Sequence, residues 1–212
     1  MRGIGEVRSA IAAIAARLDP AIAASCRTIR PGDGDRLTPA ERAALGGAVE
    51  SVRCASGAAR VVARGLLRCA GAARPIELVP QRPDGPIWPA GYLGSLTHDR
   101  AVAAAAIAPR GALLGIGIDV EPLEPLPAEI YAMVVTPGEH AQIAGDPIAA
   151  RLLFVIKEAV YKATHPVDRI FLDHHDVEVD LAAGVARTRS GRRVAFAADR
   201  GSRLVALAVL RA

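Results

Sequence analysis

Two carboxylates close an apolar run in the middle of the chain. Residues 115–121 read Gly-Ile-Gly-Ile-Asp-Val-Glu, which predicts a strand whose residues i and i+2 share one face, about 7 Å apart along it. Asp119 and Glu121 could therefore hold one hard cation from two sides, and Mg²⁺ suits such oxygen ligands better than Zn²⁺ does. Two solvated carboxylates at the end of a strand would have the same spacing.

A predicted helix further along carries a second acidic and basic pair. Residues 154–162 read Phe-Val-Ile-Lys-Glu-Ala-Val-Tyr-Lys, and positions i and i+4 of a helix lie on one face, which brings Glu158 and Lys162 together. Taken alone, this spacing is also that of an ordinary surface ion pair.

A third segment ends in a hydroxyl and an imidazole. Residues 88–98 read Trp-Pro-Ala-Gly-Tyr-Leu-Gly-Ser-Leu-Thr-His, and the short strand within it ends at Thr97 and His98. Both side chains can donate a hydrogen bond to a phosphate oxygen. A histidine at such a place can equally be a structural hydrogen-bonding residue.

The three segments together, in this order, resemble the motifs of the surfactin-type and enterobactin-type 4′-phosphopantetheinyl transferase superfamily. The marks of that family are W-P-x-G-x-x-G-S-x-[ST]-H, G-I-D-x-E and [WF]-x-x-K-E-x-x-x-K. The likeness extends to an arginine-bearing segment at residues 60–67 and to residues 171–177, so that it covers roughly residues 40 to 210.

The resemblance implies an α+β fold built from two similar halves related by a pseudo-twofold axis. Each half would be a small, mostly antiparallel sheet packed with helices, and the cofactor cleft would lie between the halves. We expect residues 1–112 to form the N-terminal half and residues 113–212 the C-terminal half.

The resemblance also implies the reaction. The family moves the 4′-phosphopantetheine arm of coenzyme A to a serine of an apo acyl or peptidyl carrier protein and releases 3′,5′-ADP. Mg²⁺, with Mn²⁺ as an alternative, would be held by Asp119, Glu121 and Glu158. Glu158 would also deprotonate the serine, and Lys162 would stabilise the phosphates, so that the expected catalytic residues are Glu158, Lys162 and Asp119.

The coenzyme A site follows from the same resemblance. Arg60 matches the arginine that binds the 3′-phosphate in the family, where a guanidinium gives a bidentate contact. Arg82 lies a few residues before the Trp-Pro pair, where members of the family often carry a lysine, and could take its place. The expected cofactor-binding residues are Arg53, Arg60, Arg82, Thr97, His98, Asp119, Glu158, Lys162 and Leu172.

Periodicity predicts the elements that must position these residues. We expect a helix at Ile11 to Leu18, a helix start at residues 38–41 (Thr-Pro-Ala-Glu), and one or two helices to about residue 70. Residues 71–91 predict an irregular connection, and residues 128–164 a helix-rich stretch interrupted near Pro137 and Gly145. No internal repeat is evident. The predicted strands are 94–97, 102–108, 113–120, 177–179, 185–188, 194–198 and 204–210.

Composition narrows the partners. The 212 residues carry 26 basic and 22 acidic side chains, a net charge of +4, which favours an anionic partner. Aromatic residues make up only 3%, and without stacking platforms or a clustered basic stripe we expect no nucleic-acid partner. We expect no membrane partner, because no apolar run is long enough to span a membrane.

Three cysteines without a Cys-x-x-Cys pattern indicate reduced thiols in the cytoplasm. Two halves in one chain favour a monomer.

Two rival functions fit part of the pattern. A catalytically idle member of the same fold would bind coenzyme A or a carrier protein without transfer, although the retained carboxylates and Lys162 argue against it. A different coenzyme A enzyme, such as an acetyltransferase, would need no carboxylate triad and would be insensitive to chelators.

Overall fold

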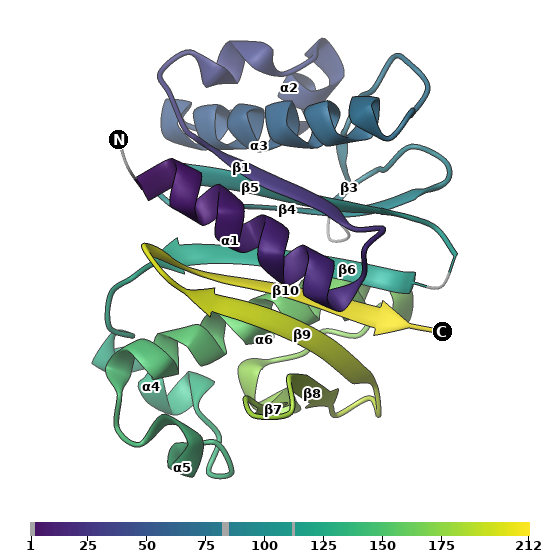
Figure 1. Cartoon of the computed structure of the whole chain (residues 1–212). Coiled ribbons are helices and arrows are strands. Elements are labelled where there is room, and N and C mark those ends of the chain that lie inside the picture. Colours follow the sequence, from purple (N-terminus) through teal and green to yellow (C-terminus); the bar gives the residue numbers. More distant parts are fainter. Residues whose placement is uncertain (1–2, 82–84, 112) are drawn as a thin grey trace.

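Two antiparallel sheets organise the molecule in the computed structural model, which describes residues 3–81, 85–111 and 113–212 (Figure 1). The first sheet has the order β1-β5-β4, formed by β1 (Ala23–Thr28), β5 (Val102–Pro109) and β4 (Tyr92–His98). The second has the order β6-β10-β9-β8-β7, formed by β6 (Leu113–Pro122), β10 (Arg203–Arg211), β9 (Arg193–Arg200), β8 (Val185–Thr188) and β7 (Val177–Asp180). The predicted α+β class is confirmed, while the pseudo-twofold relation and the boundary at 112/113 stay predictions.

Long helices cover the outer faces of the two sheets. In the N-terminal half, α3 (Glu50–Cys69) packs on β5, β1 and β4, and α2 (Pro39–Leu45) precedes it. In the C-terminal half, α6 (Pro147–Asp168) packs on β6 and β10, preceded by α4 (Ala128–Val134) and α5 (His140–Ile143). Short pieces complete the chain: η1 (Asp33–Arg36), η2 (His174–Asp176), β2 (Pro80–Gln81) and β3 (Gly85–Pro86).

Strand β5 shows how the sequence builds this layering. Its residues alternate between two cores: Ala105 and Ile107 face the α3 side, whereas Ala104 and Ala106 belong to the cluster shared with the second sheet. A strand that is buried on both faces needs apolar residues at every position. The alanine-rich run supplies them with little volume, so the two layers approach closely.

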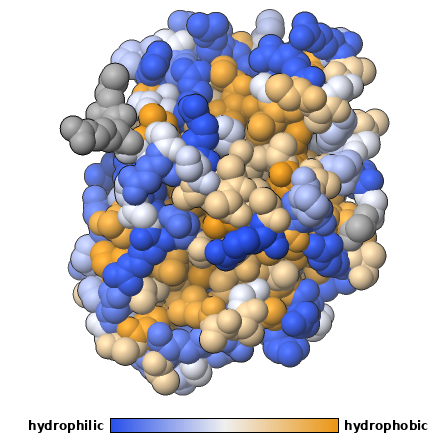
Figure 2. Space-filling model, in the orientation of Figure 1, coloured by the Kyte–Doolittle hydropathy of each residue, from blue (hydrophilic) through white to orange (hydrophobic). Residues whose placement is uncertain are grey.

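Helix α1 (Gly3–Leu18) connects the two sheets through this shared core. Its buried residues Val7, Ile11 and Ile14 pack with strands from both sheets, and it contacts β1, β9 and β10. In Figure 1 it crosses the front of the molecule, and Figure 2 shows hydrophilic residues interspersed with hydrophobic ones over this face. The amphipathic helix predicted at Ile11 to Leu18 is confirmed and begins earlier.

The predicted strands and helices are present with small shifts of their ends; one strand was not predicted, and one helix is longer than predicted. Strand β1 (sequence Ala-Ala-Ser-Cys-Arg-Thr) was not predicted, because it lacks an alternating apolar pattern; its pairing with β5, from Ala23 opposite Ile107, makes it a strand. Helix α6 extends beyond Thr164 and through Pro166 to Asp168.

The described residues contain no helix with both the length and the apolar character that a membrane span requires.

Candidate active site

The edge strands β4 and β6 of the two sheets meet through side chains. The backbone N–H of Ile118 donates to Ser95 Oγ at 3.1 Å, and Thr97 Oγ1 donates to Asp119 Oδ1 at 2.7 Å. Ser95 and Thr97 stand at i and i+2 on β4, so both project from the same face. These buried bonds fix the predicted phosphate-binding strand end against the predicted carboxylate strand.

Two glycines of β6 bring α6 close to this edge. A Cβ at Gly115 or Gly117 would lie 1.9 Å from the carbonyl oxygen of Ala163 or Ala159, respectively. Real atoms do not approach so closely, so only glycine permits this packing. The pattern Gly-Ile-Gly-Ile-Asp thus positions a helix as well as presenting a carboxylate.

A third close approach explains the Trp-Pro segment. A Cβ at Gly94 would lie 2.5 Å from the ring of Trp88, so the indole packs directly on the backbone of β4. The irregular connection is therefore held against the strand that ends at Thr97 and His98.

Asp119 and Lys162 form the centre of the site. Asp119 is buried, and its Oδ1 accepts hydrogen bonds from Lys162 Nζ at 2.6 Å and from Thr97. The cation comes from α6, the hydroxyl from β4 and the carboxylate from β6. The site thus joins residues of both halves.

Most of the predicted phosphate-binding residues line one cavity of about 320 Å³. The structure brings Arg60, Thr97, His98, Asp119 and Lys162 together there. An adjoining cavity of about 510 Å³ shares Lys162 and is lined by Glu158, and another of about 760 Å³ shares His98 and is lined by Glu121. The cavities together form a cleft along the edge where β4 and β6 meet.

Arg60 is held inside this cleft by its own half. Its Nε donates to the carbonyl of Leu78 at 2.9 Å, and Nη1 bonds Ser56. Burial lowers the pKa of the guanidinium, and the nearby Glu41 opposes that shift. Since arginine stays protonated in proteins, a fixed positive charge faces the cavity.

His98 opens toward two of the cavities. Partial burial against their walls, and secondly the charge of Lys162, lower the pKa of His98. The residue is exposed along the cavity, so solvent moderates this effect. A neutral imidazole at pH 7 follows, which can donate one hydrogen bond.

Arg53, another arginine predicted to bind the cofactor, is not part of this group. Arg53 bonds Glu50 Oε2 at 2.6 Å and the carbonyl of Ala48, and it is absent from the described linings of the three cavities. Arg82 lies outside the described residues. Both assignments stay predictions.

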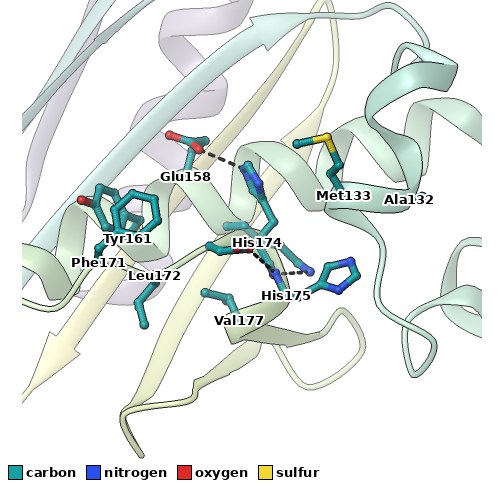
Figure 3. Close-up of a pocket in the computed structure, with 11 residues that line it drawn as sticks. Ala132, Met133, Glu158, Tyr161, Phe171, Leu172, His174, His175 and Val177 are labelled. Carbon is teal, nitrogen blue, oxygen red and sulfur yellow. Dashed lines mark hydrogen bonds and ion pairs between the residues drawn. The ribbon is translucent and has the colours of Figure 1, made fainter.

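Glu158 stands at the wall between the cleft and a further cavity of about 590 Å³, which Leu172 also lines (Figure 3). Its Oε1 lies 3.1 Å from Nε2 of His174. That hydrogen bond is the main cause that lowers the pKa of Glu158, with burial opposing it and the charge of Lys162 supporting it. Glu158 is therefore ionised at neutral pH and can accept a proton or bind a cation.

The sequence analysis assigned no role to several residues of the site. Arg151 donates to Glu121 Oε2 at 2.6 Å, Lys157 pairs with Glu139 Oε2 at 2.8 Å inside the core, and His174 contacts Glu158. The partners in these pairs are 16 to 30 positions apart, so no local sequence pattern predicts these contacts. Ser95 had a signal, since it shares a strand face with Thr97.

The three predicted metal ligands present the oxygen donors that Mg²⁺ prefers. Each is paired with a basic side chain: Asp119 with Lys162, Glu121 with Arg151, and Glu158 with His174. Within the described part of the chain, no three His, Cys, Asp or Glu side chains gather into a ready-made ion site. Mg²⁺ commonly takes one or two carboxylates together with water and substrate phosphate, a mode that needs only part of this donor set and no ready-made cluster of three.

Two family models match the chain. A family model described as "4'-phosphopantetheinyl transferase N-terminal domain" matches residues 40–108, and one described as "4'-phosphopantetheinyl transferase superfamily" matches residues 115–207. The chain belongs to the 4′-phosphopantetheinyl transferase superfamily. The two matches meet at the cleft, with Thr97 and His98 in the first and Asp119, Glu158 and Lys162 in the second.

Individual relatives include proteins named as transferases of this superfamily. The chain is 38% identical over 161 residues to "4'-phosphopantetheinyl transferase Svp" of Streptomyces mobaraensis, covering 72% of this chain and 65% of that protein. It is 37% identical over 98 residues to "4'-phosphopantetheinyl transferase PptT" of Mycobacterium tuberculosis, covering 44% and 43%. It is 32% identical over 96 residues to "Enterobactin synthase component D" of Escherichia coli (strain K12), covering 42% and 45%. The matched regions thus span less than two thirds of these relatives.

Proposed function

We propose that this chain is a 4′-phosphopantetheinyl transferase that moves the phosphopantetheine arm of coenzyme A to a serine of an apo acyl or peptidyl carrier protein. The observation that carries the proposal is the cavity where Arg60, Thr97 and His98 of one half face Asp119 and Lys162 of the other. Four basic or donor groups and one carboxylate at a single cavity suit a substrate that carries several phosphates.

The phosphates of coenzyme A would be bound from both halves. The fixed charge of Arg60 suits the 3′-phosphate, and Thr97, His98 and Lys162 suit the pyrophosphate. Leu172 would contact the cofactor in the cavity beside Glu158. Arg53 and Arg82 complete the proposed cofactor-binding set.

Asp119, Glu121 and Glu158 would hold Mg²⁺, and Mn²⁺ could take its place. When bound, the ion would neutralise negative charge on the pyrophosphate. Lys162, which donates a hydrogen bond to Asp119 in the structure, could bind a phosphate of coenzyme A instead.

The transfer itself would be an in-line displacement at the phosphorus that bears the pantetheine arm. The serine Oγ forms the new O–P bond while the bond to 3′,5′-ADP breaks, and the leaving group carries the electron pair away. Glu158 accepts the serine proton, a role that its ionised state supports. Arg60, His98 and Lys162 hold the phosphates in place, which is the larger part of catalysis in phosphoryl transfer.

The test mixes the protein with an apo carrier protein, coenzyme A and Mg²⁺, and weighs the carrier by mass spectrometry. We expect a mass gain of one phosphopantetheine, abolished by chelation. General acid–base catalysis contributes about 10²- to 10⁴-fold, so Glu158→Gln should slow transfer by at least about 10²-fold. Coenzyme A binding by calorimetry should weaken much less than transfer does, because Arg60, Thr97, His98 and Lys162 still bind the phosphates.

The carriers offered should include acyl carriers and peptidyl carriers, among them one from enterobactin assembly, because one relative is named "Enterobactin synthase component D". Measurable coenzyme A binding without transfer to any of them would favour the idle-member function. Transfer that survives chelation would contradict the metal requirement.

We also propose that the chain acts as a monomer in the cytoplasm. Its cysteines Cys26, Cys54 and Cys69 are free thiols, which suits a reducing compartment. Sedimentation of the purified chain tests the monomer.

A further inference from the structure

His174 has no part in the reaction as described so far, yet it touches the proposed base. It begins η2, just after the chain leaves α6, and its Nε2 lies 3.1 Å from Glu158 Oε1. Figure 3 shows the imidazole directed at the carboxylate, with both residues lining the cavity. The contact joins two elements 16 positions apart, so it depends on how the loop is held.

The imidazole ring of His174 is held by an aromatic contact. The ring of Phe154, one turn before Glu158 on α6, lies 5.2 Å from it between centroids, at an interplanar angle of 33°. Aromatic contacts at this distance stabilise a preferred orientation. The ring therefore packs on the same helix that carries its hydrogen-bond partner.

The backbone of His174 is fixed as well. The carbonyl of His174 accepts a hydrogen bond from Lys157 Nζ at 2.9 Å, and Lys157 is itself 1% exposed and paired with Glu139. Asp173 and Asp176 form a capping box around η2. The loop has little freedom to carry the imidazole away from α6.

Glu158 gains an orientation from this arrangement. A glutamate side chain has several rotatable bonds and loses appreciable entropy when it is fixed, and this one lines both the cleft and the neighbouring cavity. We propose that His174 is a positioning residue that fixes the Glu158 carboxylate at the junction of these two cavities. This role rests on the proposed function of Glu158 as base and ligand.

Two substitutions separate this role from a purely structural one. His174→Phe keeps a ring that can pack on Phe154 but has no donor for Glu158. His174→Gln places an amide N–H near the position of Nε2 and so keeps the donor. His140→Phe is the matched control, since His140 is exposed on α5 and its ring also packs on an aromatic residue, Tyr131.

The first experiment measures kcat and KM for transfer to a carrier protein. We expect His174→Phe to lower kcat by about 10- to 100-fold, part of the effect of a general base, with KM for coenzyme A within about twofold. His174→Gln should recover most of kcat, and His140→Phe should match the unsubstituted protein. Full activity of His174→Phe, or equal loss in His174→Gln, would overturn the proposal.

The second experiment does not depend on turnover. Urea midpoints of His174→Phe, Glu158→Gln and the double variant form a double-mutant cycle, and we expect the two effects to be non-additive because they remove the same contact. Strict additivity would contradict the contact. If the unsubstituted protein transfers nothing, the proposed function fails and this role fails with it; if it transfers but the cycle is additive, only the role of His174 fails.

Discussion

The two halves of the molecule anchor their long helices with the same short device. Residues 38–41 (Thr-Pro-Ala-Glu) and 136–139 (Thr-Pro-Gly-Glu) each end in a glutamate that is 0% exposed. Each glutamate accepts the backbone N–H of the threonine three residues earlier, Glu41 from Thr38 and Glu139 from Thr136, both at 2.9 Å.

The remaining contacts of these glutamates also correspond. Glu41 accepts the N–H of Leu78 at 2.7 Å, and Glu139 accepts that of Val179 at 2.8 Å. A basic residue of the long helix completes each set, Arg64 of α3 at 2.9 Å in the first half and Lys157 of α6 at 2.8 Å in the second. One carboxylate thus joins a turn, a distant segment and a helix in each half.

The halves differ in what the anchored helix presents beside the anchor. One turn before Arg64, α3 places the cation Arg60 in the cavity. Directly after Lys157, α6 places the carboxylate Glu158 between two cavities. The same buried device therefore positions a fixed positive charge on one side of the cleft and a titratable negative charge on the other.

The largest expected effect comes from removing the anchor of the C-terminal half. Lys157→Met leaves the charge of Glu139 buried without its cation, and breaking a buried ion pair in this way costs about 3–5 kcal/mol. The free energy of unfolding from urea titration measures the loss.

The matched change in the other half is Arg64→Met. It leaves Arg60 3.8 Å from Glu41 as a second cation, so we expect a smaller loss, about 1–3 kcal/mol. Equal losses in the two halves would show that Arg60 does not support Glu41 and that the two anchors are energetically alike.

The next effect separates the close helix contacts of the two halves. In the C-terminal half, Gly117 allows α6 to lie on β6; in the N-terminal half, a Cβ at Gly57 of α3 would lie 1.9 Å from the carbonyl oxygen of Asp33 in η1. Either glycine replaced by alanine should destabilise by about 1–3 kcal/mol through overpacking.

Activity should distinguish these two variants. Gly117→Ala pushes α6, with Glu158 and Lys162, away from Asp119, and a misplacement of about 1 Å can cost about 10²-fold in rate. Gly57→Ala displaces η1, outside the site, so kcat should stay within several-fold. Similar kcat values for the two alanine variants, measured by carrier mass gain, would contradict this division of roles.

The sequence pattern predicted the helices and most strands, because each of these elements has its own apolar periodicity. It missed β1, which is a strand only through its pairing with β5. It also missed the repeated Thr-Pro-x-Glu device. At residues 38–41 the pattern predicted a helix start, which is confirmed and carries a capping box, but the contact of Glu41 with Leu78, 37 positions away, depends on the tertiary fold.

The candidate site was also predicted only in part. Spacing paired Asp119 with Glu121 and Glu158 with Lys162, and the resemblance to the family implied that Asp119 and Lys162 share one site; in the structure they are bonded. Sequence could not supply the partners Arg151 and His174, because their contacts arise only when a loop or a helix folds back onto another element. Local spacing therefore predicts which face a residue occupies, whereas its partner across the fold depends on tertiary packing.

Acidification should affect the two sides of the cleft differently. The hydrogen bond from His174 lowers the folded-state pKa of Glu158 below its usual 4.5, so the unfolded chain takes up this proton first as pH falls. The stability that this bond contributes is present above about pH 4.5 and is lost as pH falls through the folded-state pKa. Arg60 keeps its charge throughout.

Urea midpoints of the unsubstituted protein and of Glu158→Gln between pH 3 and 7 measure this difference. We expect the two curves to converge as pH falls below about 4.5. A pH-independent gap between the unsubstituted protein and Glu158→Gln would contradict the lowered pKa of Glu158.

The smallest expected effect tests whether the halves open separately. All three cysteines belong to the N-terminal half, and burial raises the pKa of Cys26 to about 11, so at pH 8 only about one thiol in a thousand is ionised. Iodoacetamide should label exposed Cys69 quickly and Cys26 slowly. Because Cys26 packs in the core shared with β6 and β10, Lys157→Met should speed its labelling even though the change lies in the other half. An unchanged Cys26 rate, read by peptide mass spectrometry, would show that the C-terminal half unfolds without disturbing the shared core.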